Sequence, residues 1–99
     1  MNGKPYYSLK KVKSLIHDGN VIITEAATDS AVKDFKLNDE ELLKVVLRLH
    51  VSDFYKCMPS EKTEMWQDVY IKNVSDKLAY VKLQIKNNNL VVIISFKQK

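Results

Sequence analysis

Residues 77–97, KLAYVKLQIKNNNLVVIISFK, decide the fold of this chain. Before a run of three asparagines, apolar and polar residues alternate, as they do in a half-buried β-strand. A largely apolar run, also typical of a strand, follows the asparagines. Asparagine tolerates the positive φ of a tight turn better than most residues do. The stretch therefore predicts a β-hairpin, with strands at residues 77–85 and 90–97 and a turn at residues 87–89.

The register of this hairpin follows from its two apolar faces, which are Ala79, Val81, Leu83 and Ile85 on one strand and Leu90, Val92, Ile94 and Phe96 on the other. Both faces meet the same core only if Ile85 pairs with Leu90, because a slip of one residue turns a whole set outward. This register predicts that Tyr80 lies opposite Ser95 on the other side of the sheet. Lys97 then lies two residues along that same side.

Two further segments, residues 54–58 and 64–71, have the period of β-strands and precede the hairpin. Four consecutive strands joined by short turns form an antiparallel meander. A short β-branched run at residues 20–24 predicts one more strand.

The first half of the chain has the period of helices. Ser8 is the expected N-cap of a first helix, and Gly19 ends it. A second helix is expected over residues 25–35, and Asn38 with Glu41 forms the capping box of a third. The predicted class is therefore α+β, with N-terminal helices packed on one face of a mainly antiparallel sheet.

Length and composition indicate one small domain, residues 1–99, because 99 residues support a single core. Cys57 is the sole cysteine and cannot form an internal disulfide, which favours a reducing cytoplasm. The sequence contains no apolar run of membrane-spanning length and no secretory h-region, so we expect a cytoplasmic protein that does not bind a membrane.

The residue types needed for metal and nucleotide sites are sparse. His17, His50 and Cys57 lie too far apart in the sequence to have the spacing of zinc ligands, so no metal is expected. Gly3 and Gly19 are the only glycines, which excludes a glycine-rich phosphate loop. We therefore expect no cofactor.

The net charge of +4 is unevenly distributed. Residues 1–20 and 51–99 each carry a net charge of +3, whereas residues 21–50 carry −2. Fifteen of the sixteen basic residues are lysines, which contact phosphates as point charges rather than reading bases with an arginine fork. This asymmetry favours a polyanionic partner, and an ordinary solvated lysine surface is the alternative interpretation.

Four polar residues lie in strand-like runs where apolar ones are usual: Lys56, Gln67, Tyr80 and Lys97. Cleavage of RNA asks little of a protein, because the 2′-hydroxyl is itself the nucleophile. Lysines can oppose the phosphate charge, and tyrosine can donate or shuttle a proton. These residues are therefore adequate for RNA cleavage, but their spacing is not diagnostic, and solvated lysines, an exposed sheet tyrosine and a strand glutamine are the simpler explanation of them.

For two of these residues, the alternation of side chains along the strand does not decide which face of the sheet they occupy. Gln67 faces outward with Tyr80 only if Trp66 and Tyr70, which alternate with it, pack under the helices. We expect Trp66 and Tyr70 in the core rather than stacked on bases. For Lys56, the alternation does not decide the side.

At these positions the chain resembles the motility quorum-sensing regulator toxin family. The motifs that carry the resemblance are SDFYK at residues 52–56, WQDVY at 66–70, YVK at 80–82 and ISFKQK at 94–99. Members of that family are cytoplasmic toxins of type II toxin–antitoxin systems with a RelE-like fold. They are metal-independent endoribonucleases that cut mRNA at short GC-containing triplets and arrest growth.

The resemblance implies four catalytic residues, namely Lys56, Gln67, Tyr80 and Lys97. We expect Lys82 and Tyr55 to bind RNA. The implied partners are mRNA and a cognate antitoxin that combines a zinc-binding domain with a helix-turn-helix domain. The toxin–antitoxin complex is then expected to bind operator DNA and regulate transcription, and any zinc belongs to the antitoxin.

Two alternative functions remain open. A non-catalytic module can use the same lysine and tyrosine surface to hold nucleic acid, with Tyr55 or Trp66 stacked on bases. A protein-interaction domain with no role on RNA is the third hypothesis, in which the positive charge only increases solubility.

Overall fold

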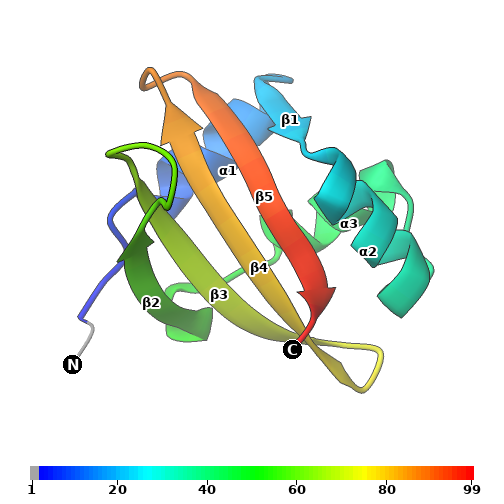
Figure 1. Ribbon diagram of the computed structural model, residues 1–99. Helices are drawn as coiled ribbons and strands as arrows, with labels where there is room; N and C mark the ends of the chain where they lie inside the picture. Colours follow the sequence, from blue (N-terminus) through cyan, green and yellow to red (C-terminus); the bar gives the residue numbers. More distant parts are fainter. Residues whose placement is uncertain (1–2) are drawn as a thin grey trace.

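The computed structural model describes residues 3–99, so the first two residues of the predicted domain lie outside the described range. Three α-helices and one short 3-10 helix precede the last four strands of the sheet (Figure 1). The helices are α1 (Leu9–His17), α2 (Glu25–Phe35), α3 (Asp39–Leu47) and the 3-10 turn η1 (Val51–Asp53). The strands are β1 (Val21–Ile23), β2 (Phe54–Pro59), β3 (Trp66–Val74), β4 (Lys77–Lys86) and β5 (Leu90–Gln98).

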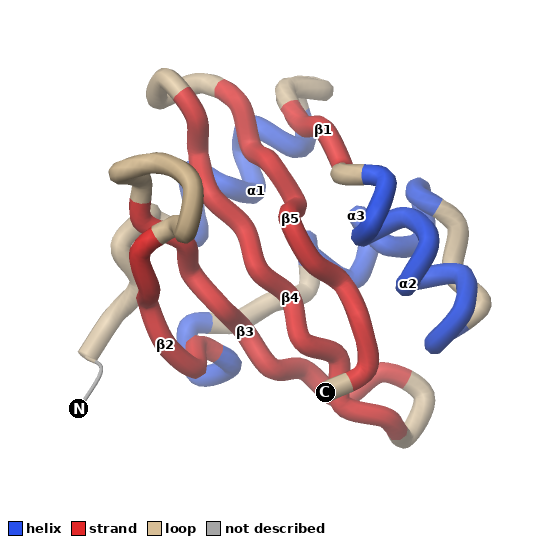
Figure 2. The backbone as a smooth tube through the Cα atoms, viewed as in Figure 1, coloured by secondary structure: helices blue, strands red, loops and turns tan. Residues whose placement is uncertain are grey.

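The strands form one five-stranded sheet in the order β1-β5-β4-β3-β2. Strands β2 to β5 are an antiparallel meander, and β1 pairs with β5 in parallel. In the view of Figures 1 and 2, α1 and α3 lie behind the sheet and α2 lies beside β5, while the front face of the sheet is free of helices. The α+β prediction, with helices on one face of a mainly antiparallel sheet, is confirmed. No helix within residues 3–99 is long and apolar enough to cross a membrane.

The helix caps agree with the sequence. The Ser8 side chain accepts a hydrogen bond from the Lys11 amide at 3.2 Å, and Gly19 follows α1 with a φ of +82°. Asn38 and Glu41 form both hydrogen bonds of the capping box, at 2.8 and 2.9 Å. Each bond satisfies an amide that the helix itself leaves unpaired.

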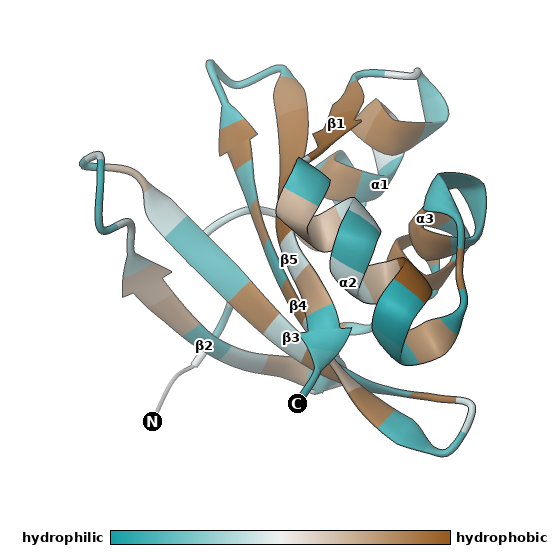
Figure 3. Cartoon of the chain, turned by 45° about the vertical axis from the view of Figure 1, so that its right-hand side comes forward, coloured by the Kyte–Doolittle hydropathy of each residue, from teal (hydrophilic) through white to brown (hydrophobic). Residues whose placement is uncertain are grey.

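The hydrophobic core lies between the sheet and the helices, and in Figure 3 apolar segments of β1 and β5 lie beside them. Its largest fully buried members are Tyr70, Phe96, Leu42, Leu49, Leu83 and Ile93. The expectation that both aromatic residues of WQDVY are in the core is half right. Tyr70 is fully buried, but 41% of the Trp66 side-chain surface is exposed, because no helix covers the beginning of β3.

The predicted register of the β4–β5 hairpin is wrong at the turn. Ile85 lies opposite Val91 rather than Leu90, because three residues separate the paired ends of the strands. Asn87 and Asn88 have φ values of 52° and 61°, the positive φ expected of asparagine in a tight turn. The turn was therefore placed correctly, and its length shifted the pairing.

A β-bulge shifts the register once more. Ile94 is an extra residue on β5. It lies between Ile93, which pairs with Leu83, and Ser95, which pairs with Lys82. Tyr80 therefore lies directly opposite Lys97, not opposite Ser95 as predicted. The bulge also changes which residues face the helices, and those of β5 are Val91, Ile93 and Phe96. The predicted neighbourhood of Tyr80 and Lys97 on the other face survives both shifts.

A buried carboxylate attaches the N-terminal segment to the helix-facing side of β3. Asp68 has no exposed surface, and its two oxygens accept hydrogen bonds from the amides of Tyr6 and Tyr7 at 2.9 and 2.8 Å. Cys57 lies opposite it on β2. Burial, together with the negative charge of Asp68, raises the pKa of the Cys57 thiol to about 11. The thiol is therefore protonated at neutral pH.

The hydroxyl of Tyr70 is buried without a hydrogen-bond partner among residues 3–99. Burial, and the nearby Asp68 and Asp53 carboxylates, raise the pKa of Tyr70. Because the unpaired hydroxyl costs free energy on burial, we expect Tyr70→Phe to leave stability unchanged or raise it by about 1 kcal/mol. Tyr7→Phe is the matched control, because it removes a 2.7 Å bond to the Trp66 carbonyl and is expected to destabilise by about 1 kcal/mol. Urea unfolding measures both, and a clear loss of stability in Tyr70→Phe contradicts the prediction.

Candidate active site

The helix-free side of the sheet presents three rows of side chains, and we call this surface the open face. The rows are Met58, Gln67, Gln84 and Val92; Lys56, Val69, Lys82 and Ser95; and Ile71, Tyr80 and Lys97. Directly opposed residues of an antiparallel pair share one face. The register therefore brings all four predicted catalytic residues to the open face, which alternation alone left undecided for Lys56 and Gln67.

Tyr80 and Lys97 are direct neighbours across β4 and β5. The Lys97 ammonium nitrogen, Nζ, lies 5.3 Å from the centre of the Tyr80 ring, within the range of a cation–π contact. Tyr80 is partly buried and has Ile71 on its other side, whereas Lys97 is exposed. The partly buried ring therefore has the positive charge of an exposed lysine over it.

Lys56 and Lys82 lie on either side of Val69, which has no exposed surface although it faces away from the helices. Long lysine stems cover apolar surface while their charged ends remain in water. Two strand spacings, about 10 Å, separate the two backbones. The two lysines can therefore contact two different phosphates of one nucleic-acid strand.

The charge of this surface is not neutralised by the protein. None of the residues in the three rows is acidic. Over residues 3–99 the one ion pair is Lys72 with Asp53, at 3.9 Å, and it involves none of these lysines. Because unpaired cations on one face attract polyanions, the open face is suited to the phosphate backbone of a nucleic acid.

Gln67 is buried and its position is held by a neighbour. Its Nε2 donates a hydrogen bond to Oε1 of Gln84 at 3.1 Å, and its own side-chain oxygen is an acceptor that this bond does not use. Beside it is a hollow of about 250 Å³. This hollow is lined by Gln67, Lys82, Met58 and Ile94 and by Ser60, Glu61 and Lys62 of the β2–β3 loop.

Tyr55 lies at a bulge in β2, where the register shifts between Phe54 and Lys56. The Nζ atoms of Lys56 and Lys99 lie 5.6 and 5.9 Å from the centre of its ring. Lys99 was not among the predicted site residues, because its position beside Tyr55 depends on how the end of β5 lies across the sheet. The loop residues around the hollow were also missed, because they lie outside the strands that the alternation predicts.

Comparison with known proteins places these residues in a family. The family model described as "Motility quorum-sensing regulator, toxin of MqsA" matches residues 4–98. The chain belongs to this family. A curated relative, the mRNA interferase toxin MqsR of Escherichia coli (strain K12), is 33% identical over 96 residues, which cover 96% of this chain and 95% of the relative. The family resemblance expected from the sequence is thus confirmed.

In this member of the toxin family, the open face combines cations, a phenol and an amide. Lysines supply positive charge, Tyr80 supplies a hydroxyl that can donate a proton, and Gln67 supplies a fixed hydrogen-bonding group. Within residues 3–99 no three His, Cys, Asp or Glu side chains are grouped so that they could hold a metal ion. The side chains present on the open face offer proton transfer and electrostatic stabilisation.

Proposed function

We propose that this chain is the toxin of a type II toxin–antitoxin system and cleaves mRNA as a metal-independent, sequence-selective endoribonuclease, thereby inhibiting translation and growth. Residues 1–99 act as a single toxin domain in the cytoplasm. The observation that carries the proposal is the open face, where Tyr80 lies among lysines that form no ion pair within residues 3–99. Membership of a toxin family supports it, as does the similarity to a protein named as an mRNA interferase.

The reaction that suits this surface is internal attack by the RNA. The 2′-hydroxyl gives its proton to solvent water and its oxygen bonds to the adjacent phosphorus, and the bond from phosphorus to the 5′-oxygen breaks. One product then ends in a 2′,3′-cyclic phosphate and the other in a 5′-hydroxyl. In this proposal the Tyr80 hydroxyl gives a proton to the leaving 5′-oxygen, and the adjacent Lys97 opposes the charge that develops on the phosphate.

The other residues position the substrate. Lys56 and Lys82 hold phosphates on either side of the scissile one, and Gln67 hydrogen-bonds to the reacting nucleotide. Tyr55 offers an aromatic surface on which a base can stack. Catalysis thus depends on Lys56, Gln67, Tyr80 and Lys97, with Lys82 and Tyr55 in RNA binding.

A cognate antitoxin is the proposed protein partner, because the description of the family names its members as toxins of MqsA. We propose that this antitoxin binds zinc through one domain and operator DNA through another. The toxin–antitoxin complex then regulates transcription of its own operon, while free toxin cleaves mRNA.

Incubation of the purified protein with an mRNA in the presence of EDTA tests the proposal. We expect cleavage at a restricted set of sites, with 2′,3′-cyclic phosphate and 5′-hydroxyl ends identified by end mapping. RNA that is bound but remains intact contradicts the proposal and supports the non-catalytic binding module. Neither binding nor cleavage favours the protein-interaction domain.

A further inference from the structure

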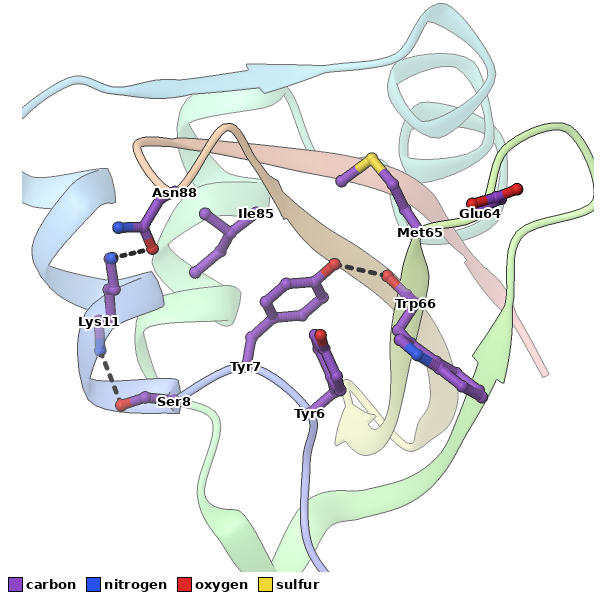
Figure 4. A pocket seen from close by; sticks show the side chains of 9 residues that line it. All are labelled: Tyr6, Tyr7, Ser8, Lys11, Glu64, Met65, Trp66, Ile85 and Asn88. Carbon is purple, nitrogen blue, oxygen red and sulfur yellow. Dashed lines mark hydrogen bonds between the residues drawn. The ribbon is translucent and has the colours of Figure 1, made fainter.

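A larger hollow lies outside the open face, at the end of the sheet where β3 begins. It has a volume of about 540 Å³ and lies between the N-terminal segment, the start of β3 and the β4–β5 turn (Figure 4). We call it the aromatic pocket. The lining residues on which the argument depends are Tyr6, Tyr7, Trp66, Lys11, Glu64 and Asn88.

Two exposed rings of this pocket lie near each other at a tilt. The ring centres of Tyr6 and Trp66 are 6.0 Å apart with an angle of 32° between the planes, and the residues are 59% and 41% exposed. Tyr7 packs edge-on against Tyr6 at 4.9 Å. Because Asp68 binds both tyrosine amides and Tyr7 binds the Trp66 carbonyl, the rings are held in place before any ligand arrives.

Polar groups surround the rings, as recognition of a planar polar ligand requires. Lys11 Nζ donates a hydrogen bond to Oδ1 of Asn88, which places a positive charge and an amide at one side of the pocket. Glu64 lies at the other side, where its carboxylate can accept hydrogen bonds. A ligand with an aromatic face, hydrogen-bonding edges and a linked phosphate matches this combination.

The pocket is also continuous with the proposed catalytic surface. Met65 lines the pocket, and its sulfur lies 3.6 Å from Nε2 of Gln84, which in turn is bonded to Gln67 on the open face. Trp66 and Gln67 are consecutive, so their side chains leave β3 on opposite faces. A strand of RNA that crosses Gln67 therefore has only to turn around the beginning of β3 to bring a neighbouring base to Trp66.

We propose that the aromatic pocket binds an unstacked base of the single-stranded RNA whose scissile phosphate lies on the open face. This inference rests on the proposed function. It adds to the RNA contacts at the open face a second contact, which tolerates different bases. Stacking on exposed rings is available to every base, whereas contact with Glu64, Lys11 and Asn88 favours bases with matching edges.

Trp66 is the only tryptophan of the chain, so its fluorescence reports the pocket directly. The probe is a short single-stranded RNA in which every 2′-hydroxyl is methylated, since it can bind the wild-type protein but cannot attack itself. We expect saturable quenching of the fluorescence on titration. In parallel, anisotropy of the labelled RNA is expected to show an affinity about 5- to 150-fold weaker for Trp66→Ala, and similarly for Tyr6→Ala, as is typical for loss of one stacked base.

Trp66→Phe retains an aromatic ring and is expected to bind within a few-fold of wild type. Leu78→Ala is the matched control, because Leu78 is 46% exposed but lies at the opposite end of β4. If the wild-type protein cleaves RNA and binds the probe while its fluorescence and the Trp66→Ala affinity stay unchanged, the pocket is not an RNA subsite and the proposed function still stands. If these substitutions instead weaken only the complex with the antitoxin, the pocket belongs to the protein partner and the inference is equally wrong.

Discussion

Tyr80→Phe is expected to lower the rate of RNA cleavage about 100- to 10,000-fold, the usual contribution of a positioned proton donor. The substitution removes only the hydroxyl. The remaining ring keeps its place beside Ile71 and its contact with Lys97. Binding of the methylated RNA is therefore expected to be unchanged, and the loss is expected in kcat rather than in KM.

Tyr70→Phe is the matched control for this experiment. Tyr70 is on the neighbouring strand but faces the helices, so the same chemical change is made on the other side of the sheet. We expect it to cleave RNA at the wild-type rate. Equal losses in Tyr70→Phe and Tyr80→Phe would mean that the effect arises from the sheet rather than from a hydroxyl in the site.

A modified substrate can determine whether the Tyr80 hydroxyl donates a proton or removes one. If Tyr80 protonates the leaving 5′-oxygen, then replacing that oxygen by sulfur, a leaving atom that needs no proton, is expected to restore most of the rate to Tyr80→Phe. If Tyr80 instead removes the proton of the 2′-hydroxyl, the sulfur substrate is expected to be cleaved as poorly as the normal one. Only the first outcome agrees with the proposed mechanism.

Lys82→Ala provides a contrast with Tyr80→Phe. Lys82 lies in the centre of the open face beside Val69, and we propose that it contacts a phosphate. Loss of one phosphate contact is expected to weaken binding, and to reduce the slope of log affinity against log salt concentration by about one. A substitution that changes binding and salt dependence thus differs from one that changes the chemical step.

The hairpin at residues 77–97 shows what alternation can and cannot predict. In β4, polar residues separate the apolar ones, and the predicted helix-facing set is correct. In β5, Leu90 to Ile94 are apolar without interruption, so no alternation marks the bulge at Ile94. The register was therefore wrong by one residue at the turn and by two beyond the bulge, although Tyr80 and Lys97 remained neighbours.

Trp66 and Asp68 show a different limit. Trp66 was expected in the core because large aromatic residues are usually buried, but it is 41% exposed. Asp68, whose own placement the sequence did not predict, is fully buried although carboxylates are usually exposed. Their surroundings come from the N-terminal segment, about sixty residues away in the sequence, which binds Asp68 and leaves Trp66 partly open. A contact of that range has no local pattern, so the aromatic pocket was not predictable.

Asp68→Asn is expected to destabilise the fold strongly, although the residue lies outside the open face. The buried carboxylate accepts two amide hydrogen bonds, one on each oxygen. Asparagine keeps one acceptor but turns an NH₂ group toward the other amide, which leaves buried donors unpaired. We expect a loss of about 2–4 kcal/mol from a total stability of about 5–15 kcal/mol, and thus a melting temperature lower by about 10–25 °C. Asp76→Asn, an exposed residue in the β3–β4 turn, makes the same change in charge and is expected to shift stability by less than about 0.5 kcal/mol.

In Asp68→Asn, local unfolding is expected to begin at the N-terminal segment. Hydrogen exchange of the Tyr6 and Tyr7 amides is predicted to accelerate far more than that of the core amides of β4, because those two amides lose their acceptor directly. Cleavage measured well below the new melting temperature then separates two roles for the segment. If RNA affinity falls while the open face stays folded, the aromatic pocket contributes to substrate binding, since Tyr6 has left Trp66. If affinity and kcat are both unchanged at that temperature, Asp68 serves stability alone, and the open face binds and cleaves RNA without the N-terminal segment.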